Sequence, residues 1–199
     1  MAKKVVILGA NGYVGGVFAK QFLDRGDSVV SISRSGRPDK DVDWYDKIDW
    51  EMGDPLDKDA PWEKYLAGAD ILVDTVGEYM EHLDKGMTYE KVNYQTALNI
   101  ADAAERQKVP IFIFISIDDD PAFPDRRLFT TKRDAEDYLK QRDFISILAR
   151  PSAMYPADQY KKGEGPHRSL LVDDVASSVI AATDTVKETE TLKVDDLER

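Results

Sequence analysis

The sequence contains no cysteine and only two histidines, His82 and His167. Without cysteine the chain forms no disulfide and offers neither a thiolate metal ligand nor a cysteine nucleophile. Two histidines are also too few for a histidine-rich metal centre. We therefore expect no metal site.

Long apolar runs and an excess of positive charge are also lacking. The apolar stretch at residues 5–8 is too short for the core of a signal peptide, and no uncharged run is long enough to span a membrane. A cytoplasmic location is the resulting expectation. The formal net charge is -11 over 199 residues, and so acidic a surface repels the phosphates of nucleic acids and anionic membranes. Any phosphate-binding site must then be a local feature.

Short runs rich in β-branched residues alternate with longer amphipathic stretches. This alternation predicts an α/β fold in which helices cover both faces of a parallel sheet. Several expected strands, such as residues 111–115, are wholly apolar, which indicates burial on both faces. The expected strands are residues 4–8, 28–33, 49–52, 71–76, 111–117, 146–149 and 192–194. The expected helices are residues 14–22, with a stop at Gly26, and residues 61–66, 88–107, 132–141 and 173–182.

A glycine-rich turn joins the first expected strand to the first expected helix. Its sequence is Gly9-Ala10-Asn11-Gly12-Tyr13-Val14-Gly15, with the spacing Gly-x-x-Gly-x-x-Gly. Glycine lets a backbone turn sharply and approach a pyrophosphate closely, while the helix N-terminus offers unpaired amides and partial positive charge. A tight turn without a ligand is the alternative interpretation. The residues that we expect to bind a dinucleotide here are Gly9, Asn11, Gly12, Tyr13, Val14 and Gly15.

Arg34 follows the second expected strand, in the segment Ser33-Arg34-Ser35-Gly36-Arg37. An acidic residue at this position would hydrogen-bond the ribose 2′-hydroxyl of NAD, whereas a guanidinium pairs with the 2′-phosphate of NADP. Ser33, Ser35 and Arg37 add further donors. The segment therefore favours NADP(H) over NAD(H), unless both arginines are ordinary surface charges.

The glycine spacing and the serine- and arginine-rich segment together resemble the extended and atypical short-chain dehydrogenase/reductase superfamily. The resemblance is strongest to its NAD(P)H-binding members of the NmrA-like, complex I accessory-subunit and quinone-biosynthesis-associated types. It implies a Rossmann-type, doubly wound parallel sheet. Because no repeat, low-complexity segment or linker divides the chain, we expect a single NAD(P)-binding domain over residues 1–199.

The resemblance also implies a substrate region and further cofactor contacts. Residues 155–172 form the expected substrate-side loop region, which is reduced: about 16 residues separate Tyr155 from Val172. The further positions are Asp54, near the adenine amino group, Val76 and Gly77, along the cofactor, Asn93, supporting the active site, and Pro151 and Met154, facing the nicotinamide. The alternatives are a surface turn for Asp54, a plain turn for Gly77 and local hydrogen bonds for Asn93.

The reduction chemistry of this superfamily needs a tyrosine as proton donor, a lysine four residues later and a serine that orients the substrate oxygen. Ser116 and Lys132 match the serine and the lysine, but Leu128 stands in place of the tyrosine. Lys132 then holds only the cofactor ribose, or another donor supplies the proton, or the hydride acceptor needs no protein acid. The alternative donors are Tyr79, Tyr155, Asp118 and water.

Two functions from different classes follow. The first is an NADP(H)-dependent oxidoreductase that acts on a small or flat acceptor, which is a carbonyl, a quinone or a flavin. The second is a non-catalytic NAD(P)H-binding redox sensor or assembly factor, which Leu128 favours. The missing tyrosine and the short substrate region argue against an epimerase or dehydratase of activated sugars. The expected partner is a small-molecule substrate or none, and the sequence leaves an oligomer open.

Overall fold

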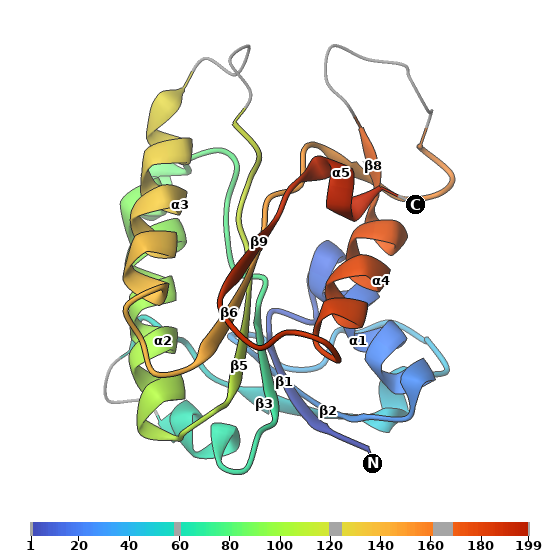
Figure 1. Ribbon diagram of the computed structural model, residues 1–199. Helices are drawn as coiled ribbons and strands as arrows, with labels where there is room; N and C mark the ends of the chain where they lie inside the picture. The colour runs from blue at the N-terminus through green and yellow to red at the C-terminus, as the bar shows by residue number, and fades with distance from the viewer. Residues whose placement is uncertain (1, 58–60, 120–124, 161–168, 199) are drawn as a thin grey trace.

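In the computed structural model, which describes residues 2–57, 61–119, 125–160 and 169–198, seven parallel strands form one central sheet. Their order is β3-β2-β1-β4-β5-β6-β9 (Figure 1). The strands are β1 Lys4–Leu8, β2 Ser28–Ser33, β3 Ile48–Met52, β4 Ile71–Asp74, β5 Ile111–Ile115, β6 Ile145–Ala149 and β9 Glu190–Leu192. A separate two-stranded parallel sheet pairs β7 Met154–Tyr155 with β8 Leu170–Leu171.

Helices cover both faces of the central sheet (Figure 1). One face carries α1 Tyr13–Arg25, α4 Val172–Ala182 and α5 Val194–Leu197. The other carries α2 Thr96–Arg106, α3 Arg126–Leu139 and the 3-10 helix η2 Pro61–Leu66. The remaining short elements are the 3-10 helices η1 Tyr45–Lys47 and η3 Leu83–Lys85 and the π-helix η4 Glu90–Gln95. Among the described residues, no helix is both long and apolar enough to cross a membrane.

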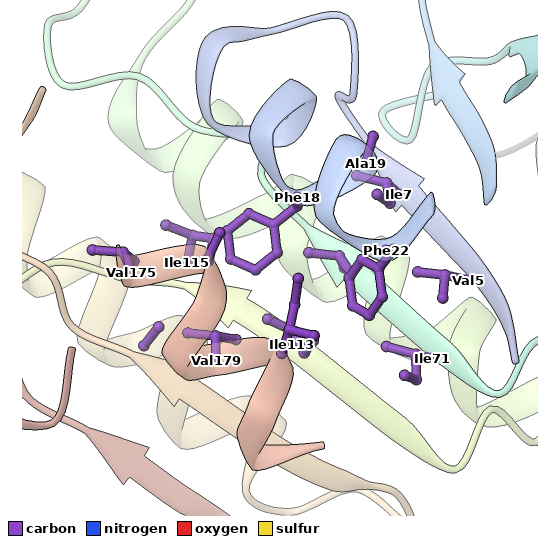
Figure 2. Close-up of a cluster of buried hydrophobic side chains, with 14 of the residues drawn as sticks. Val5, Ile7, Phe18, Ala19, Phe22, Ile71, Ile113, Ile115, Val175 and Val179 are labelled. Carbon is purple, nitrogen blue, oxygen red and sulfur yellow. The ribbon is translucent and has the colours of Figure 1, made fainter. Parts of the chain in front are cut away.

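The sheet is buried on both sides because its strands present apolar residues in both directions. In β1, Val5 and Ile7 face α1 and α4, while Val6 and Leu8 face the opposite helical layer. Figure 2 shows Phe18 of α1 pointing into the first of these two cores, between the sheet and α4. Full burial of such a side chain contributes about 1.5–3 kcal/mol. These two apolar cores hold the strands rigidly and place their carboxyl ends along one edge.

The predicted α/β fold with a doubly wound parallel sheet is confirmed, and the differences lie at element boundaries. The expected helix at residues 132–141 begins earlier, at Arg126, because the Asp125 side chain caps it by accepting a hydrogen bond from the Arg127 amide. The expected helix at 88–107 is α-helical only from Thr96. Its first part is π-helical, and the Thr96 hydroxyl donates to the carbonyl of Lys91, five residues earlier.

Other elements differ from the expectation in their bounds or their type. The strands expected at 71–76 and 111–117 end at Asp74 and Ile115, where the chain turns into loops at the edge of the sheet. The strand expected at 192–194 was placed too late, because α5 begins at Val194 and β9 covers Glu190–Leu192. Residues 61–66 form a 3-10 helix and not an α-helix. Part of the expected loop region, residues 161–168, lies outside the described residues.

Candidate functional site

A cleft of about 1080 Å³ opens where the carboxyl ends of β1 and β4 meet the loops after β2 and β3. The chain runs outward from β1 to β3 and then returns to β4, so the strand order reverses at β1 and β4. Ligands of open α/β sheets bind at such a reversal. The predicted cofactor residues that line the cleft are Gly9, Asn11, Gly12, Ser33, Arg34, Ser35, Asp54, Val76 and Gly77.

The glycine turn forms the floor of the cleft beside β1. Gly9 has φ +95°, and the Gly12 amide donates to the Gly9 carbonyl over 2.9 Å. A Cβ on Gly15 would lie 2.3 Å from the Gly9 carbonyl oxygen, so this contact between turn and helix admits only glycine. Gly12 caps α1 without a side-chain hydrogen bond, and the first turn of α1 carries no acid. The turn therefore offers free amides and a helix dipole, which fit a pyrophosphate.

Thr75 completes this turn, and the sequence analysis missed it. Its hydroxyl donates to the Leu8 carbonyl over 2.7 Å, and its Oγ1 would lie 2.7 Å from a Cβ on Gly15. Thr75 also lines the cleft. It thus ties the end of β4 to the end of β1 beneath the glycines. Its position directly after an apolar strand was the available signal.

Three of the predicted cofactor residues in the glycine segment do not line the cleft. Val14 packs against the core and Gly15 packs against Gly9. Tyr13 is about half exposed, and partial burial together with the charges of Asp173 and Asp158 raises its pKa to about 12. The structure thus places all three where they shape the first turn of α1.

The two arginines in the segment after β2 have different surroundings. Arg34 is exposed, lines the cleft and makes no hydrogen bond or ion pair with any residue that the structure describes. Arg37 lies outside the cleft lining, and its Nη1 forms an ion pair with Asp46 over 2.7 Å. The Asn11 side-chain amide donates to the Ser35 hydroxyl over 2.9 Å, which joins the glycine turn to this segment. Arg34 is thus the arginine available to an anion in the cleft.

Asp54 and Asn93 organise loops around the cleft. The Asp54 carboxylate accepts a hydrogen bond from the Leu56 amide over 2.9 Å while it lines the cleft. Asn93 is fully buried, and its side chain exchanges two 2.8 Å hydrogen bonds with the backbone of Glu78. This pairing fixes the loop that follows Gly77. The local hydrogen bonds considered for Asn93 are therefore present, and Asp54 makes the kind of contact expected of an acid in a turn.

Lys132 lies directly behind the cleft wall and does not line it. Its buried Nζ donates to the Ile115 carbonyl over 2.9 Å and sits 4.6 Å from the ring centroid of Phe114. A Cβ on Gly77 would lie 3.0 Å from this Nζ, so the missing side chain leaves the ammonium beside the wall. Burial lowers the pKa of Lys132 to about 8, although the charges of Asp74 and Glu136 act in the opposite direction.

Asp74, at the end of β4, is a buried carboxylate that the sequence analysis did not select. Its Oδ1 accepts from the Val76 amide over 2.9 Å, whereas its Oδ2 has no hydrogen-bond partner among the described residues. Burial raises the pKa of Asp74 to about 6, against the opposing effects of the Lys132 charge and the Val76 amide. The signal was a charged residue inside an otherwise apolar strand.

Ser116 is engaged away from the cleft. Its hydroxyl donates to Glu136 over 2.5 Å, and Glu136 is fully buried between Arg133 and Arg150. Burial disfavours the charge on Glu136, but hydrogen bonds from Arg150 and Ser116 and the nearby arginine charges lower its pKa overall. Ser116 therefore belongs to an ion-pair network, and it does not line the cleft.

The position of the missing tyrosine is filled by an apolar cluster. Leu128 is buried and packs with Tyr89 and Phe129. The alternative donors Tyr79 and Tyr155 are 67% and 40% exposed, and neither lines the cleft. The cleft lining also lacks Pro151, Met154 and Asp118. The Asp118 amide donates a hydrogen bond to the Pro151 carbonyl, and Met154 packs against the core from β7.

The far wall of the cleft includes four residues to which the sequence analysis assigned no role. His82, Lys85, Met87 and Lys91 line it, and the backbones of His82 and Met87 are joined by two hydrogen bonds. No spacing in the sequence marks these residues. They come together only because the loop after Gly77 folds back on itself.

The family described as NAD(P)H-binding matches residues 9–185. An uncharacterized chloroplastic protein of Arabidopsis thaliana is 32% identical over 158 residues, which is 77% of this chain. The chain spans about half of that relative, since the match covers 51% of its length. MIOREX complex component 2 of Saccharomyces cerevisiae is 26% identical over 86% of this chain and 78% of its own.

Solved structures agree in fold. The Bordetella bronchiseptica enzyme WbmH, in complex with NAD+, matches 97% of this chain and 75% of its own with a TM-score of 0.74 and 21% identity. A putative NAD-dependent epimerase/dehydratase from Bacillus halodurans matches 96% of this chain and 93% of its own, with a TM-score of 0.72 and 19% identity. Because this family match spans residues 9–185, the chain belongs to the NAD(P)H-binding family.

Proposed function

We propose that this chain is an NADP(H)-binding oxidoreductase with the cofactor held along the cleft. The pyrophosphate lies at the N-terminus of α1 and the 2′-phosphate at Arg34. The observation that carries the proposal is the state of Arg34, an exposed guanidinium in the cleft lining without a partner among the described residues. A bidentate donor in this position binds a phosphate and has no comparable partner on NADH.

Titration of the protein with NADPH and NADH, followed by quenching of its three tryptophans, tests this assignment. Arg34→Ala should weaken NADPH binding by about 10- to 100-fold, because a charge-assisted hydrogen bond is lost, and should leave NADH binding nearly unchanged. Arg37→Ala is the matched variant, since Arg37 pairs with Asp46 outside the cleft. Equal weakening of both nucleotides by Arg34→Ala would contradict the 2′-phosphate contact.

The acceptor is best matched by a flat molecule that takes up hydride without a protein acid. Leu128 has no exchangeable proton and Ser116 donates to Glu136, so the two groups that protonate and orient a carbonyl are not presented. NADPH supplies the hydride, and a quinone or flavin takes its proton from solvent. Loss of NADPH absorbance should therefore be faster with a quinone or flavin than with a simple aldehyde.

The buried Leu128 cluster also supports a second candidate, a non-catalytic NAD(P)H-binding sensor or assembly factor. The yeast relative, named as a component of the MIOREX complex, favours an assembly role. Both candidates bind NADPH, and only the oxidoreductase consumes it. Tight binding without acceptor-dependent oxidation across carbonyls, quinones and flavins would select the second candidate.

A cytoplasmic location also stays a proposal. The plant relative is described as chloroplastic, which favours an organelle for that protein and provides the alternative to test. Imaging of the tagged full chain in its own cells decides between these compartments. A signal confined to an organelle would contradict the cytoplasmic location.

A further inference from the structure

We propose that Lys132 and Asp74 couple NADP(H) binding to proton uptake, with Lys132 as the group that takes up the proton. The inference rests on the proposed function, since it presumes a dinucleotide in the cleft. It assigns Asp74, which no motif marks, as the residue that sets the charge state of Lys132. Asp74 comes from the end of β4, which neighbours β5 in the sheet, and Lys132 comes from α3.

The position of Lys132 makes it responsive to a ligand. Its Nζ is fixed by the Ile115 carbonyl at 2.9 Å and lies over the Phe114 ring. Gly77 lines the cleft, and the space that a side chain on Gly77 would take reaches to 3.0 Å from Nζ. Lys132 is therefore buried from solvent and lies against Gly77, a cleft-lining residue without a side chain.

The carboxylate of Asp74 supplies the negative charge that acts on the Lys132 ammonium. In the sheet Asp74 is paired with Leu8 on β1 and Phe114 on β5, and it is 1% exposed. Its Oδ2 has no hydrogen-bond partner among the described residues. A buried carboxylate oxygen without a donor is unfavourable, and a neighbouring cation relieves part of that penalty. Asp74 and Lys132 thus stabilise each other's charged form.

The other charged group that acts on Lys132 is Glu136, one helical turn along α3. Its carboxylate forms ion pairs with Arg133 and Arg150 and accepts a hydrogen bond from the Ser116 hydroxyl. Asn93, which also approaches Gly77, is uncharged and engaged with the backbone of Glu78. Asp74 is therefore the carboxylate beside Lys132 that lacks another cation among the described residues.

The direction of the coupling follows from these surroundings. Burial lowers the pKa of Lys132 to about 8, so free protein near this pH holds a mixture of ammonium and amine. Phosphates and ribose oxygens in the adjoining cleft favour the ammonium and raise its pKa. Binding then takes up a proton, and by linkage the affinity for NADPH falls as the pH rises through about 8, by at most tenfold per pH unit.

Calorimetric titration with NADPH in two buffers of different ionisation enthalpy measures the number of protons exchanged. At about pH 8 we expect a net uptake of protons on binding, because part of the free Lys132 is deprotonated there. Lys132→Met should abolish this uptake. Lys140→Met, at the solvent-exposed end of the same helix, is the matched control and should retain it.

Asp74→Asn provides a second test in which Lys132 is retained. Loss of the carboxylate lowers the pKa of Lys132 further, in the free and in the bound protein, so the pH range of proton uptake and the pH dependence of NADPH affinity should both move to lower pH. An unchanged profile in Asp74→Asn would contradict the pairing, even if Lys132→Met failed to fold. NADPH binding with no net proton exchange in the wild type would overturn the inference and leave the proposed function intact. Absence of NADPH binding at every pH would overturn both.

Discussion

Gly15 lies where the glycine turn touches its own helix, and this contact separates it from the neighbouring Gly16. A Cβ on Gly15 would meet the Gly9 carbonyl oxygen at 2.3 Å, and backbone atoms in a tight turn cannot move aside. Gly15→Ala should lower the free energy of unfolding by about 1–3 kcal/mol and weaken NADPH binding, because the turn must open. Urea unfolding and nucleotide titration measure the two effects.

Gly16→Ala is the control for this variant. Its Cβ would lie 3.4 Å from the Ala10 carbonyl oxygen, an ordinary contact, and alanine inside a helix is favoured over glycine by about 0.5–1 kcal/mol. It should therefore be neutral or stabilising. Similar losses in both variants would show that helix α1 tolerates no added methyl group and that the Gly9 contact is not the cause.

At this residue scale the sequence identified the groups whose roles follow from local position. Gly9 and Gly12 could be found because they lie between a strand and a helix, and Arg34 because it directly follows the next strand. Asp74 and Glu136 were missed, because what makes them matter is burial and pairing with residues from other strands. Those contacts exist only after the sheet has formed.

At the scale of elements, Glu136 joins α3 to the ends of β5 and β6. Its fully buried carboxylate accepts a hydrogen bond from the Ser116 hydroxyl and forms an ion pair with Arg150. Glu136→Gln should lower the free energy of unfolding by about 3–5 kcal/mol, because Arg150 keeps its charge in a partly buried site without its counter-ion. Asp137→Asn, on an exposed neighbouring position, should change stability little.

The stabilisation by Glu136 should also depend on pH, in a direction that its pKa determines. The pKa of Glu136 in the folded protein is lowered, so its contribution to stability is present above the unfolded-state pKa of 4.5 and is lost as the pH falls through the folded value. The stability difference between wild type and Glu136→Gln should therefore shrink in acid. A difference that stays constant from neutral to acid pH would contradict the ion-pair role.

Elements were predicted better than their boundaries, for a physical reason. Strands such as β5 are apolar throughout because both of their faces are covered, and that pattern is visible in the sequence. The start of α3 and the π-helical turn before α2 depend instead on single side-chain hydrogen bonds, from the Arg127 amide to Asp125 and from Thr96 to the Lys91 carbonyl. Hydrophobic periodicity carries no information about such bonds.

For the whole molecule, the glycine turn after the first strand let the sequence predict one side of the cleft, whereas the reversal of strand order between β1 and β4 became visible only in the assembled sheet. The sequence could not reveal that residues 82–91 close the far wall, because a loop's return path is set by its own contacts. It also could not show that Ser116 turns toward Glu136. The position of the glycine turn was therefore predictable from the sequence, whereas the far wall of the cleft and the hydrogen bonding of Ser116 were not.

The proposal of a single domain can be tested with a substitution at one edge of the sheet and with the fluorescence of tryptophans at the other edge. Leu197 of α5 is fully buried beside α4, next to the β9 edge. All tryptophans, Trp44, Trp50 and Trp62, lie on or near the β3 edge. If the chain unfolds as one unit, Leu197→Ala should lower stability by about 2–5 kcal/mol and shift tryptophan fluorescence and circular dichroism equally.

The exposed Leu83→Ala provides the control for this experiment, since a leucine that is 69% exposed contributes little to the core. Coincident transitions in Leu197→Ala mean that a cavity under α5 is felt across all seven strands of the sheet. A circular dichroism change that precedes the fluorescence change would mean that β9 and α5 unfold separately. The cleft would then belong to an independent unit, and the single-domain proposal would fail.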